Sequence, residues 1–351
     1  MTTAAATDIP VAPELGEAEL GPEERAALGR IVAANMRTLH TVRGVTPRGQ
    51  HGKAHGVVRA RFVVRDDIPD RLRVGVFAAP AAFDALVRFS SGSHDDDRLP
   101  DAHGMAIKLF AAPDAPLGAS LCPDPSGAAS QDFILIDREI FFCRSLLEYR
   151  AFGDAYSNIV RFLHKQGSVF ALARGIAVLK FLRPQLGARA KAFAAQTPRS
   201  PVATHYWSAT PYRLGDAAVK YMAVSPLAAA PGAQAGVTDR DGLRLALGWA
   251  LRQGPVAFDF GAHLRSDPAR HPVEDPSVSW TANGAEFVPL ARVEIPEQVV
   301  APINPSAEHL VFSLWNCAQP HRPLGAINRA RREVYAAMAE ARLARDGVAP
   351  R

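Results

Sequence analysis

The segment HRPLGAINRARREVY, residues 321–335, lies near the end of the chain and determines how the rest of the sequence is interpreted. A proline and a glycine interrupt the chain at its start, and neither residue type recurs until Gly347. The Ala- and Arg-rich run between these breaks predicts a helix. Arg331 and Tyr335 are four residues apart and Arg342 follows seven residues later. These spacings place the three side chains on one helix face.

Such a face has two interpretations. A phenol between two guanidinium groups is favoured in its phenolate form. A phenolate is a hard anionic ligand, and tyrosine serves in this form as an axial ligand of haem iron. Taken alone, however, the pattern is more typical of a solvated helix with one aromatic side chain at its edge. Only motifs elsewhere in the chain can distinguish the two interpretations.

Composition sets the broad class of the protein. With 351 residues, the chain can form one large domain or two. It is 48% hydrophobic and 21% charged, with a formal net charge of +5, which is ordinary for a globular protein. The basic residues are mostly arginines and are scattered, so we find no nucleic-acid-binding footprint. Arginine is also the residue that binds buried carboxylates.

The compartment is inferred from three cysteines and from two sequence stretches. Cys122, Cys143 and Cys317 are odd in number and lack CxxC spacing, which argues against a disulfide framework or a zinc site and favours a reducing compartment. Residues 1–21 lack the basic and apolar regions of a signal peptide. Residues 169–182, the most apolar run, are too few to span a bilayer. We therefore expect a cytoplasmic protein without a membrane span.

Eight segments have the composition of β-strands, in two groups of four separated by a helical region. Residues 1–21 predict a flexible arm, and residues 22–351 a single domain. Helices are expected at residues 22–38 and 241–252 and, with breaks at Gly167 and Pro184, across residues 146–195. Because strands and helices do not alternate, the chain predicts an α+β protein with a large antiparallel barrel, a helical insertion and a helical C-terminus. The strands are expected at residues 57–64, 85–90, 104–111, 132–136, 204–209, 217–224, 256–264 and 287–295.

Short motifs along the chain resemble, in order, those of the haem catalases. Arg48 followed by His51-Gly-Lys resembles the catalase segment in which an arginine precedes His-Ala-Lys-Gly. Residues 87–90, Val-Arg-Phe-Ser, look like a catalase strand. Residues 101–108, DAHGMAIK, resemble Asp-Pro-Arg-Gly-Phe-Ala-Val-Lys, with His103 in place of the usual arginine.

The resemblance continues to the C-terminal helix. Residues 140–144, IFFCR, resemble the catalase stretch Ile-Phe-Phe-Ile-Arg, and Arg331-x-x-x-Tyr335 matches the proximal motif. Each motif is weak alone, but their order and spacing together are specific. The resemblance covers about residues 35–345 and is closest to short, catalase-like bacterial haem proteins, the catalase-related peroxidases. It implies a catalase-like fold with an eight-stranded antiparallel β-barrel.

The resemblance also implies a haem cofactor, with haem b the expected type. Tyr335 would be the axial ligand of the haem iron on the proximal side, held as a phenolate by Arg331. The haem propionates are buried carboxylates, which need charged and hydrogen-bonded partners. Three arginines would provide them: Arg48, Arg88 and Arg342.

On the distal side, the resemblance assigns two residues. His51 would be the base that takes a proton from a bound peroxide and delivers it to the leaving oxygen. Ser90 would orient His51 by a hydrogen bond. His55 is a rival for the role of His51, because the alignment needs a gap of one residue. The match of His51-x-Lys53 favours His51, and we expect His55 at the surface or at a strand edge.

One departure from the catalase pattern concerns the distal pocket. Catalases have an asparagine five residues before the first phenylalanine of the Phe-Phe pair. Here that position is Ile136, or Asp137 if the register shifts by one residue. Neither an apolar side chain nor an ionised carboxylate can donate the hydrogen bond that positions peroxide. This departure argues against efficient dismutation of hydrogen peroxide.

These observations favour a haem-dependent oxidoreductase that reduces hydrogen peroxide or organic hydroperoxides. The alternatives are a true catalase, a hydroperoxide-rearranging lyase or dehydratase, and a non-catalytic haem-binding protein; a homo-oligomer is left open. The apolar side chains of residues 169–182 either pack against the barrel or line a channel that would favour bulky organic hydroperoxides. These side chains are Val169, Phe170, Leu172, Ile176, Val178, Leu179, Phe181 and Leu182.

Overall fold

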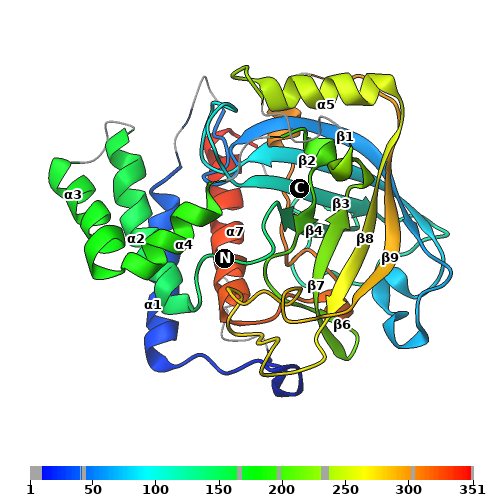
Figure 1. The fold of residues 1–351 in the computed structure, drawn as a ribbon, viewed down its shortest axis with the longest axis horizontal. Helices are drawn as coiled ribbons and strands as arrows, with labels where there is room; N and C mark the ends of the chain where they lie inside the picture. Colours follow the sequence, from blue (N-terminus) through cyan, green and yellow to red (C-terminus); the bar gives the residue numbers. More distant parts are fainter. Residues whose placement is uncertain are drawn as a thin grey trace.

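A large β-barrel with helices on one side forms the body of the protein (Figure 1). The computed structural model describes residues 10–39, 41, 45–163, 168–195, 199–230, 237–301 and 305–348. Helix α7 (Ala326–Arg345) stands between the barrel and a helical group, while α5 (Gly242–Gln253) crosses one end of the barrel. No helix in the described part of the chain is long and apolar enough to cross a membrane.

The barrel consists of antiparallel strands. In the sheet, β1 to β4 follow one another as neighbours, and β1 pairs on its other side with β9, which continues to β8 and β7. The short strand β5 pairs with both β4 and β7 and so closes an eight-stranded barrel, as predicted. A ninth strand, β6, pairs with β7. The strands are β1 Lys53–Val64, β2 Ala82–Ser91, β3 His103–Phe110, β4 Ser130–Ile136, β5 Tyr206–Trp207, β6 Tyr212–Leu214, β7 Ala217–Val224, β8 Val256–Leu264 and β9 Phe287–Ile295.

Side chains fill the interior of the barrel. Alternate residues of β1 are buried, because successive side chains of a strand point to opposite faces. Phe62 of β1 packs against Phe133 and Phe260 with ring centroids 5.8 and 5.2 Å apart, and Phe133 and Phe260 are 4.8 Å apart. A barrel of eight strands is just wide enough to be filled by such side chains. The space for a ligand therefore lies outside the barrel wall.

The helical group positions α7 against this wall. Helix α7 begins after Gly325, whose φ of 87° is a conformation that glycine adopts readily. Its buried residues Ile327, Ala330 and Val334 share a hydrophobic cluster with Ile31 of α1 and Leu146 of α2. The remaining helices are α1 Pro22–Met36, α2 Leu146–Leu163, α3 Val169–Ala177, which continues into a π-helical turn at Val178–Leu182, α4 Pro184–Phe193 and α6 Pro305–His309.

The predicted architecture is confirmed, with some differences in its elements. The fold is α+β, and the helical insertion, the C-terminal helix and the barrel are all present. The strand expected at residues 204–209 is limited to Tyr206–Trp207. Of the predicted flexible arm, residues 1–9 lie outside the described part of the chain. In the second half of the arm, residues 10–21, four side chains are buried: Ala12, Leu15, Glu17 and Leu20.

Glu17 anchors this packed segment. Its side chain is buried, forms an ion pair with the buried guanidinium of Arg322, and accepts a hydrogen bond from the backbone N–H of Gly325 at 2.8 Å. Leu15 and Leu20 are also buried. The segment thus connects the start of the chain to the turn that precedes α7.

We expect Glu17→Ala to lower the free energy of unfolding by about 3–5 kcal/mol, because it leaves the charge of Arg322 buried without its partner. Urea denaturation followed by circular dichroism measures this change. Asp67→Ala is the control, since it removes an exposed ion pair with Arg65, and such pairs contribute little. Equal stability of the Glu17→Ala variant and the unchanged protein would contradict the anchoring role.

Candidate active site

A cavity of about 380 Å³ lies between the outer face of the barrel and the helices. On β2, Val87 and Phe89 point into the barrel core, so Arg88 and Ser90 point out and line the cavity. On β3 and β4 the division is less strict, because Met105 and Leu135 belong to the barrel core and also line the cavity. Helix α7 forms the opposite wall with one face. The lining residues from these elements include Arg88, Ser90, Gly104, Ala106, Ile134, Ile136, Arg331, Val334, Tyr335, Met338 and Arg342.

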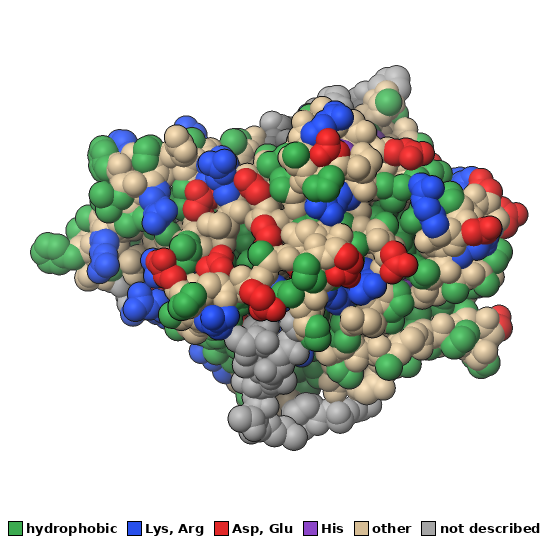
Figure 2. Space-filling model, turned by 90° about the horizontal axis from the view of Figure 1, so that it is seen from below, with side chains coloured by type: hydrophobic (Ala, Val, Ile, Leu, Met, Phe, Trp, Pro, Cys, Tyr) green, Lys and Arg blue, Asp and Glu red, His purple; other side chains and the backbone are tan. Residues whose placement is uncertain are grey.

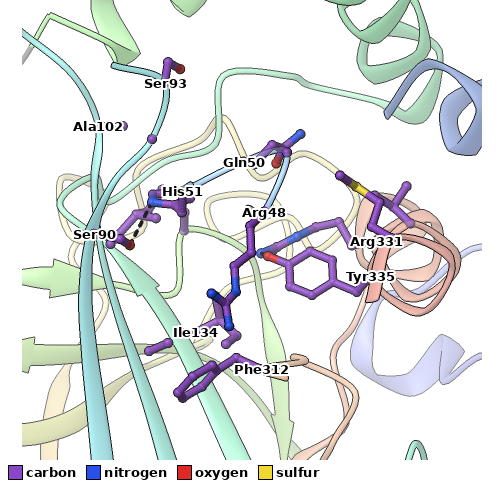
Figure 3. A pocket seen from close by; sticks show the side chains of 18 of the residues that line it. Arg48, Gln50, His51, Ser90, Ser93, Ala102, Ile134, Phe312, Arg331 and Tyr335 are labelled. Carbon is purple, nitrogen blue, oxygen red and sulfur yellow. Dashed lines mark hydrogen bonds between the residues drawn. The ribbon is translucent and has the colours of Figure 1, made fainter. Parts of the chain in front are cut away.

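A buried arginine is paired with a tyrosine on the α7 wall (Figure 3). Arg331 Nη2 donates to the phenolic oxygen of Tyr335 at 3.1 Å, and its Nη1 donates to Thr210 Oγ1 at 3.1 Å and to Asn328 Oδ1 at 3.2 Å. Burial lowers the pKa of Arg331, but its interactions with Tyr335 and Tyr212 outweigh burial and raise the pKa overall. The guanidinium is therefore a fixed positive charge beside the phenol.

A histidine and a serine face this pair from the barrel side of the cavity (Figure 3). His51 Nδ1 lies 3.3 Å from Ser90 Oγ. His51 has a φ of 54°, unusual for a residue with a side chain, and its backbone N–H donates to Gly92 O at 2.9 Å. A Cβ at Gly104 would lie 2.7 Å from His51 Nδ1 and 2.9 Å from Ser90 Oγ. The imidazole of His51 can therefore occupy this position only because residue 104 has no side chain.

Burial determines the protonation of this histidine. It lowers the pKa of His51 to about 4, against the raising effect of Asp101. At neutral pH the imidazole is therefore uncharged. With Nδ1 next to Ser90, the other ring nitrogen is available to accept a proton.

Three arginines from separate parts of the chain meet in the cavity wall. Arg48 donates to Glu308 Oε2 at 3.1 Å and to the carbonyl oxygen of Leu310. Arg342 donates to the carbonyl oxygens of the same two residues. Arg88 donates to the carbonyl oxygen of His51 at 2.9 Å, while its buried Nε has no hydrogen-bond partner among the described residues.

These arginines carry more positive charge than their surroundings neutralise. Burial lowers the pKa of Arg48 well below its ordinary value, and the charges of Arg88 and Arg342 lower it further. Burial also lowers the pKa of Arg88 to about 10. Among the described side chains, the carboxylate that forms an ion pair with this cluster is that of Glu308. Three guanidinium groups and one carboxylate leave two positive charges, so the cluster is suited to an anionic guest.

The seven residues singled out in the sequence thus line one cavity, but the expectation for His55 was wrong. His55 is 1% exposed, so it lies neither at the surface nor in the cavity. Its Nε2 is 3.0 Å from Ser91 Oγ, and its Nδ1 is 3.7 Å from Asp97. The pairing of β1 with β2 skips His55, because a β-bulge lies between Ala54 and Gly56. The extra residue of the bulge turns the imidazole into the interior.

The two candidates for the catalase asparagine position lie in different places. Ile136, together with Ile134, lines the cavity. Asp137 is buried and accepts hydrogen bonds from the backbone and from Nδ1 of His103 at 2.9 and 2.7 Å. Ile134 and Ile136 therefore add apolar surface to the cavity wall, whereas Asp137 is not among the lining residues.

The expectation for the apolar side chains of residues 169–182 was also wrong, since none of the eight lines the cavity. Most of the eight do not pack against the barrel either, because Val169, Phe170, Ile176, Phe181 and Leu182 are exposed. The insertion contributes to the cavity through other residues of α2 and α4. These are Tyr149, Phe152, Tyr156, Ala190 and Phe193.

Sequence reasoning missed both the α2 residues and Glu308. Tyr149, Phe152 and Tyr156 follow one another at intervals of three and four, a helical spacing that could have indicated a shared aromatic face. Glu308, in contrast, has no sequence signal. Its partnership with Arg48 spans 260 residues and depends on the tertiary fold.

Comparison with known structures identifies the fold. A bacterial catalase matches with a TM-score of 0.62 and 16% identity over 98% of this chain and 66% of its own. Catalase A from Saccharomyces cerevisiae matches with a TM-score of 0.60 and 15% identity over 96% and 68%, and a fungal catalase with 0.57 and 15% over 94% and 65%. No protein-family model and no curated protein matches the sequence.

The fold is thus that of the catalases, as the sequence motifs predicted. The chain spans about two thirds of the length of the catalase chains that it matches.

The buried position of His51 predicts a measurable pH dependence. The folded chain keeps this imidazole neutral down to a pH of about 4, whereas an exposed histidine in the unfolded chain takes up its proton near 6.5. The free energy of unfolding should therefore fall as the pH drops through this window, because the unfolded chain binds more protons. We expect the imidazole signal of His51 in NMR spectra, assigned with His51→Gln, to titrate near pH 4. A midpoint near 6.5 would show that the imidazole is solvated.

Proposed function

We propose that the protein is a haem-dependent oxidoreductase that reduces hydrogen peroxide or organic hydroperoxides. The observation that carries this proposal is the arrangement of two pairs across one cavity (Figure 3). Tyr335 with Arg331 offers an anionic ligand on the α7 side, and His51 with Ser90 offers a neutral base on the barrel side. The catalase fold supports the same interpretation, since the cavity is formed by the motifs that resemble those of catalases.

The charges in the cavity wall fit a haem group. Haem b carries two propionate carboxylates, and the two positive charges left by Arg48, Arg88, Arg342 and Glu308 would balance them. The buried Nε of Arg88, which has no partner within the described part of the chain, would gain an acceptor. Burial of these arginines near one another is costly without such a guest. We therefore assign the arginines to propionate binding and Tyr335 to iron ligation.

In this proposal, bound haem would supply oxidation–reduction chemistry at its iron, with electrons from an external donor. His51 would take a proton from one oxygen of the peroxide and deliver it to the leaving oxygen, so that water or an alcohol departs. Ser90 holds Nδ1 and so fixes which ring nitrogen faces the substrate. Arg331 keeps a positive charge beside Tyr335, which favours the anionic ligand throughout.

The apolar wall supports reduction by an external donor over dismutation of hydrogen peroxide. Ile134 and Ile136 cannot donate a hydrogen bond to peroxide. Together with Phe152 and Phe193, they instead offer surface to an alkyl chain, and each methylene that is buried there adds roughly 0.8 kcal/mol of binding. The same wall would suit a lyase or dehydratase acting on a fatty-acid hydroperoxide, and the assay below separates these reactions.

Tyr335→Phe is expected to abolish or strongly weaken haem binding, because it removes the anionic ligand and leaves the cavity shape nearly unchanged. The visible absorption spectrum and the haem content of the purified variant measure the effect. Tyr149→Phe is a matched control, because Tyr149 lines the same cavity but is not assigned to the iron. Full haem content with an unchanged spectrum in Tyr335→Phe would refute the proposed ligand.

His51→Ala is expected to retain haem and to lose reaction with peroxide by about 10²- to 10⁴-fold, the usual contribution of a general acid–base group. His55→Gln serves as the control, because His55 is also buried but lies outside the cavity. If His55→Gln loses the reaction with peroxide and His51→Ala keeps it, the general acid–base group is His55 and not His51.

The products identify the reaction of the unchanged protein. Oxidation of an added phenolic donor by an alkyl hydroperoxide supports the proposal. Vigorous oxygen release from hydrogen peroxide would indicate a true catalase. Rearrangement of a fatty-acid hydroperoxide without consumption of a donor would indicate a lyase or dehydratase. Binding of haem without any reaction would indicate a non-catalytic haem-binding protein.

A further inference from the structure

The helical insertion presents a group of solvent-exposed apolar side chains on α3 and the π-helical turn that follows it. Phe170 is 88% exposed and Leu182 is 75% exposed, which is unusual for such large apolar groups. Of the ten large exposed hydrophobic side chains in the described part of the chain, five belong to this segment. We call these five residues the α3 face: Val169, Phe170, Ile176, Phe181 and Leu182.

The reverse side of the segment is firmly packed. A Cβ at Gly175 of α3 would lie 2.7 Å from the carbonyl oxygen of Ala155 in α2. A Cβ at Gly187 of α4 would lie 2.1 Å from the carbonyl oxygen of Leu179. Both contacts require glycine, so backbones meet closely there and fix the orientation of the segment. The α3 face therefore points outward as a consequence of packing.

The charges around this face have one sign. Residues 155–215 contain nine Lys or Arg and no Asp or Glu. Four of these basic side chains are exposed around the segment: Arg174, Lys180, Arg183 and Lys191. Lys180 lies 5.5 Å from the ring centre of Phe181.

The acidic residues that precede this stretch are neutralised. On α2, Glu148 forms an ion pair with Arg189, and Asp154 forms one with Arg37. The carboxylates of α2 are therefore already paired and do not offset the exposed basic side chains around the α3 face. Figure 1 places α3 at the far end of the helical group, and the same end in Figure 2 shows protruding hydrophobic side chains with Lys and Arg around them.

We propose that the α3 face docks on the surface of an anionic lipid bilayer. Aromatic and aliphatic side chains flanked by lysine and arginine are the combination by which amphipathic helices bind in the plane of a membrane interface. The apolar groups would enter the boundary between headgroups and acyl chains. Each nearby Lys or Arg adds attraction to anionic headgroups. A bilayer accounts for both properties of the face, its hydrophobicity and its uniformly positive border.

The same helices connect the docking face to the cavity. Helix α4 contacts the π-helical turn through Gly187, and further along it contributes Ala190 and Phe193 to the cavity wall. Docking would therefore hold an apolar cavity close to the source of lipid-derived hydroperoxides. This consequence for the substrate rests on the proposed function, whereas docking itself does not.

Sedimentation with vesicles tests the proposal on the full chain. One set of vesicles contains phosphatidylcholine alone, and the other contains equal parts of phosphatidylcholine and phosphatidylglycerol. We expect the unchanged protein to sediment with the anionic vesicles, and less so at high salt. The double variant Phe170→Glu/Phe181→Glu should reduce the bound fraction about tenfold or more, because it places two charges into the apolar layer. Arg174→Gln/Lys180→Gln should weaken binding to the anionic vesicles alone.

Trp249→Glu is the matched control, because Trp249 is a similarly exposed aromatic residue on α5, away from the α3 face. It should bind like the unchanged protein. Haem content and peroxide reaction in solution, measured on the same samples, report separately on the proposed function and should be unchanged in Phe170→Glu/Phe181→Glu. The proposal is overturned if the unchanged protein stays in solution with anionic vesicles or if Trp249→Glu loses as much binding. It is equally overturned if sedimentation velocity shows that Phe170→Glu/Phe181→Glu dissociates a dimer, since the face would then join two copies of the chain.

Discussion

The hydrogen bond from Arg331 to Tyr335 is the interaction on which the cavity depends. Burying a guanidinium is costly unless its donors are satisfied, and here Thr210 and Asn328 supply the other acceptors. Asn328 is itself fixed, because its side-chain amide donates to Pro211 O and its backbone carbonyl oxygen accepts from the indole of Trp315. The charge of Arg331 is thus held by the loop before β6, by the segment before α7 and by α7 itself. Because Arg331 is held in this way, the position of the Tyr335 phenol is fixed as well.

Electrostatics explains why the arginines of the cavity suit an anionic guest. The Arg48, Arg88 and Arg342 side chains repel one another in a poorly hydrated place, and Glu308 alone does not offset them. A fold tolerates such an arrangement when a guest completes it. The neutral His51, which faces Tyr335 from the barrel side, fits the same picture, because burial suppresses its charge and leaves it able to accept a proton.

Much of this could be predicted from the sequence, and the failures have physical causes. The strands followed from the composition of eight segments, and the cavity residues from motifs whose order and spacing resemble those of catalases. His55 was misplaced because a β-bulge at Ala54 and Gly56 changes the register, and composition does not reveal a bulge. The residues of the α3 face were misassigned because hydrophobicity shows that a helix has an apolar side but not what this side contacts. Glu308 could not be found, because its role exists only once distant segments are brought together.

Because the cavity lies on the outer face of the barrel, alternate residues of one strand have two separate roles. On β2, Val87 and Phe89 belong to the barrel core, while Arg88 and Ser90, interleaved with them, belong to the cavity. The core residues are constrained by packing inside the barrel, and the cavity residues by contacts with a molecule bound in the cavity. A lineage or an engineer could therefore alter chemistry at every second position of this strand without disturbing the scaffold. The filled barrel thus tolerates substitutions on its outer surface. Gly104 is an exception, since any side chain there collides with His51.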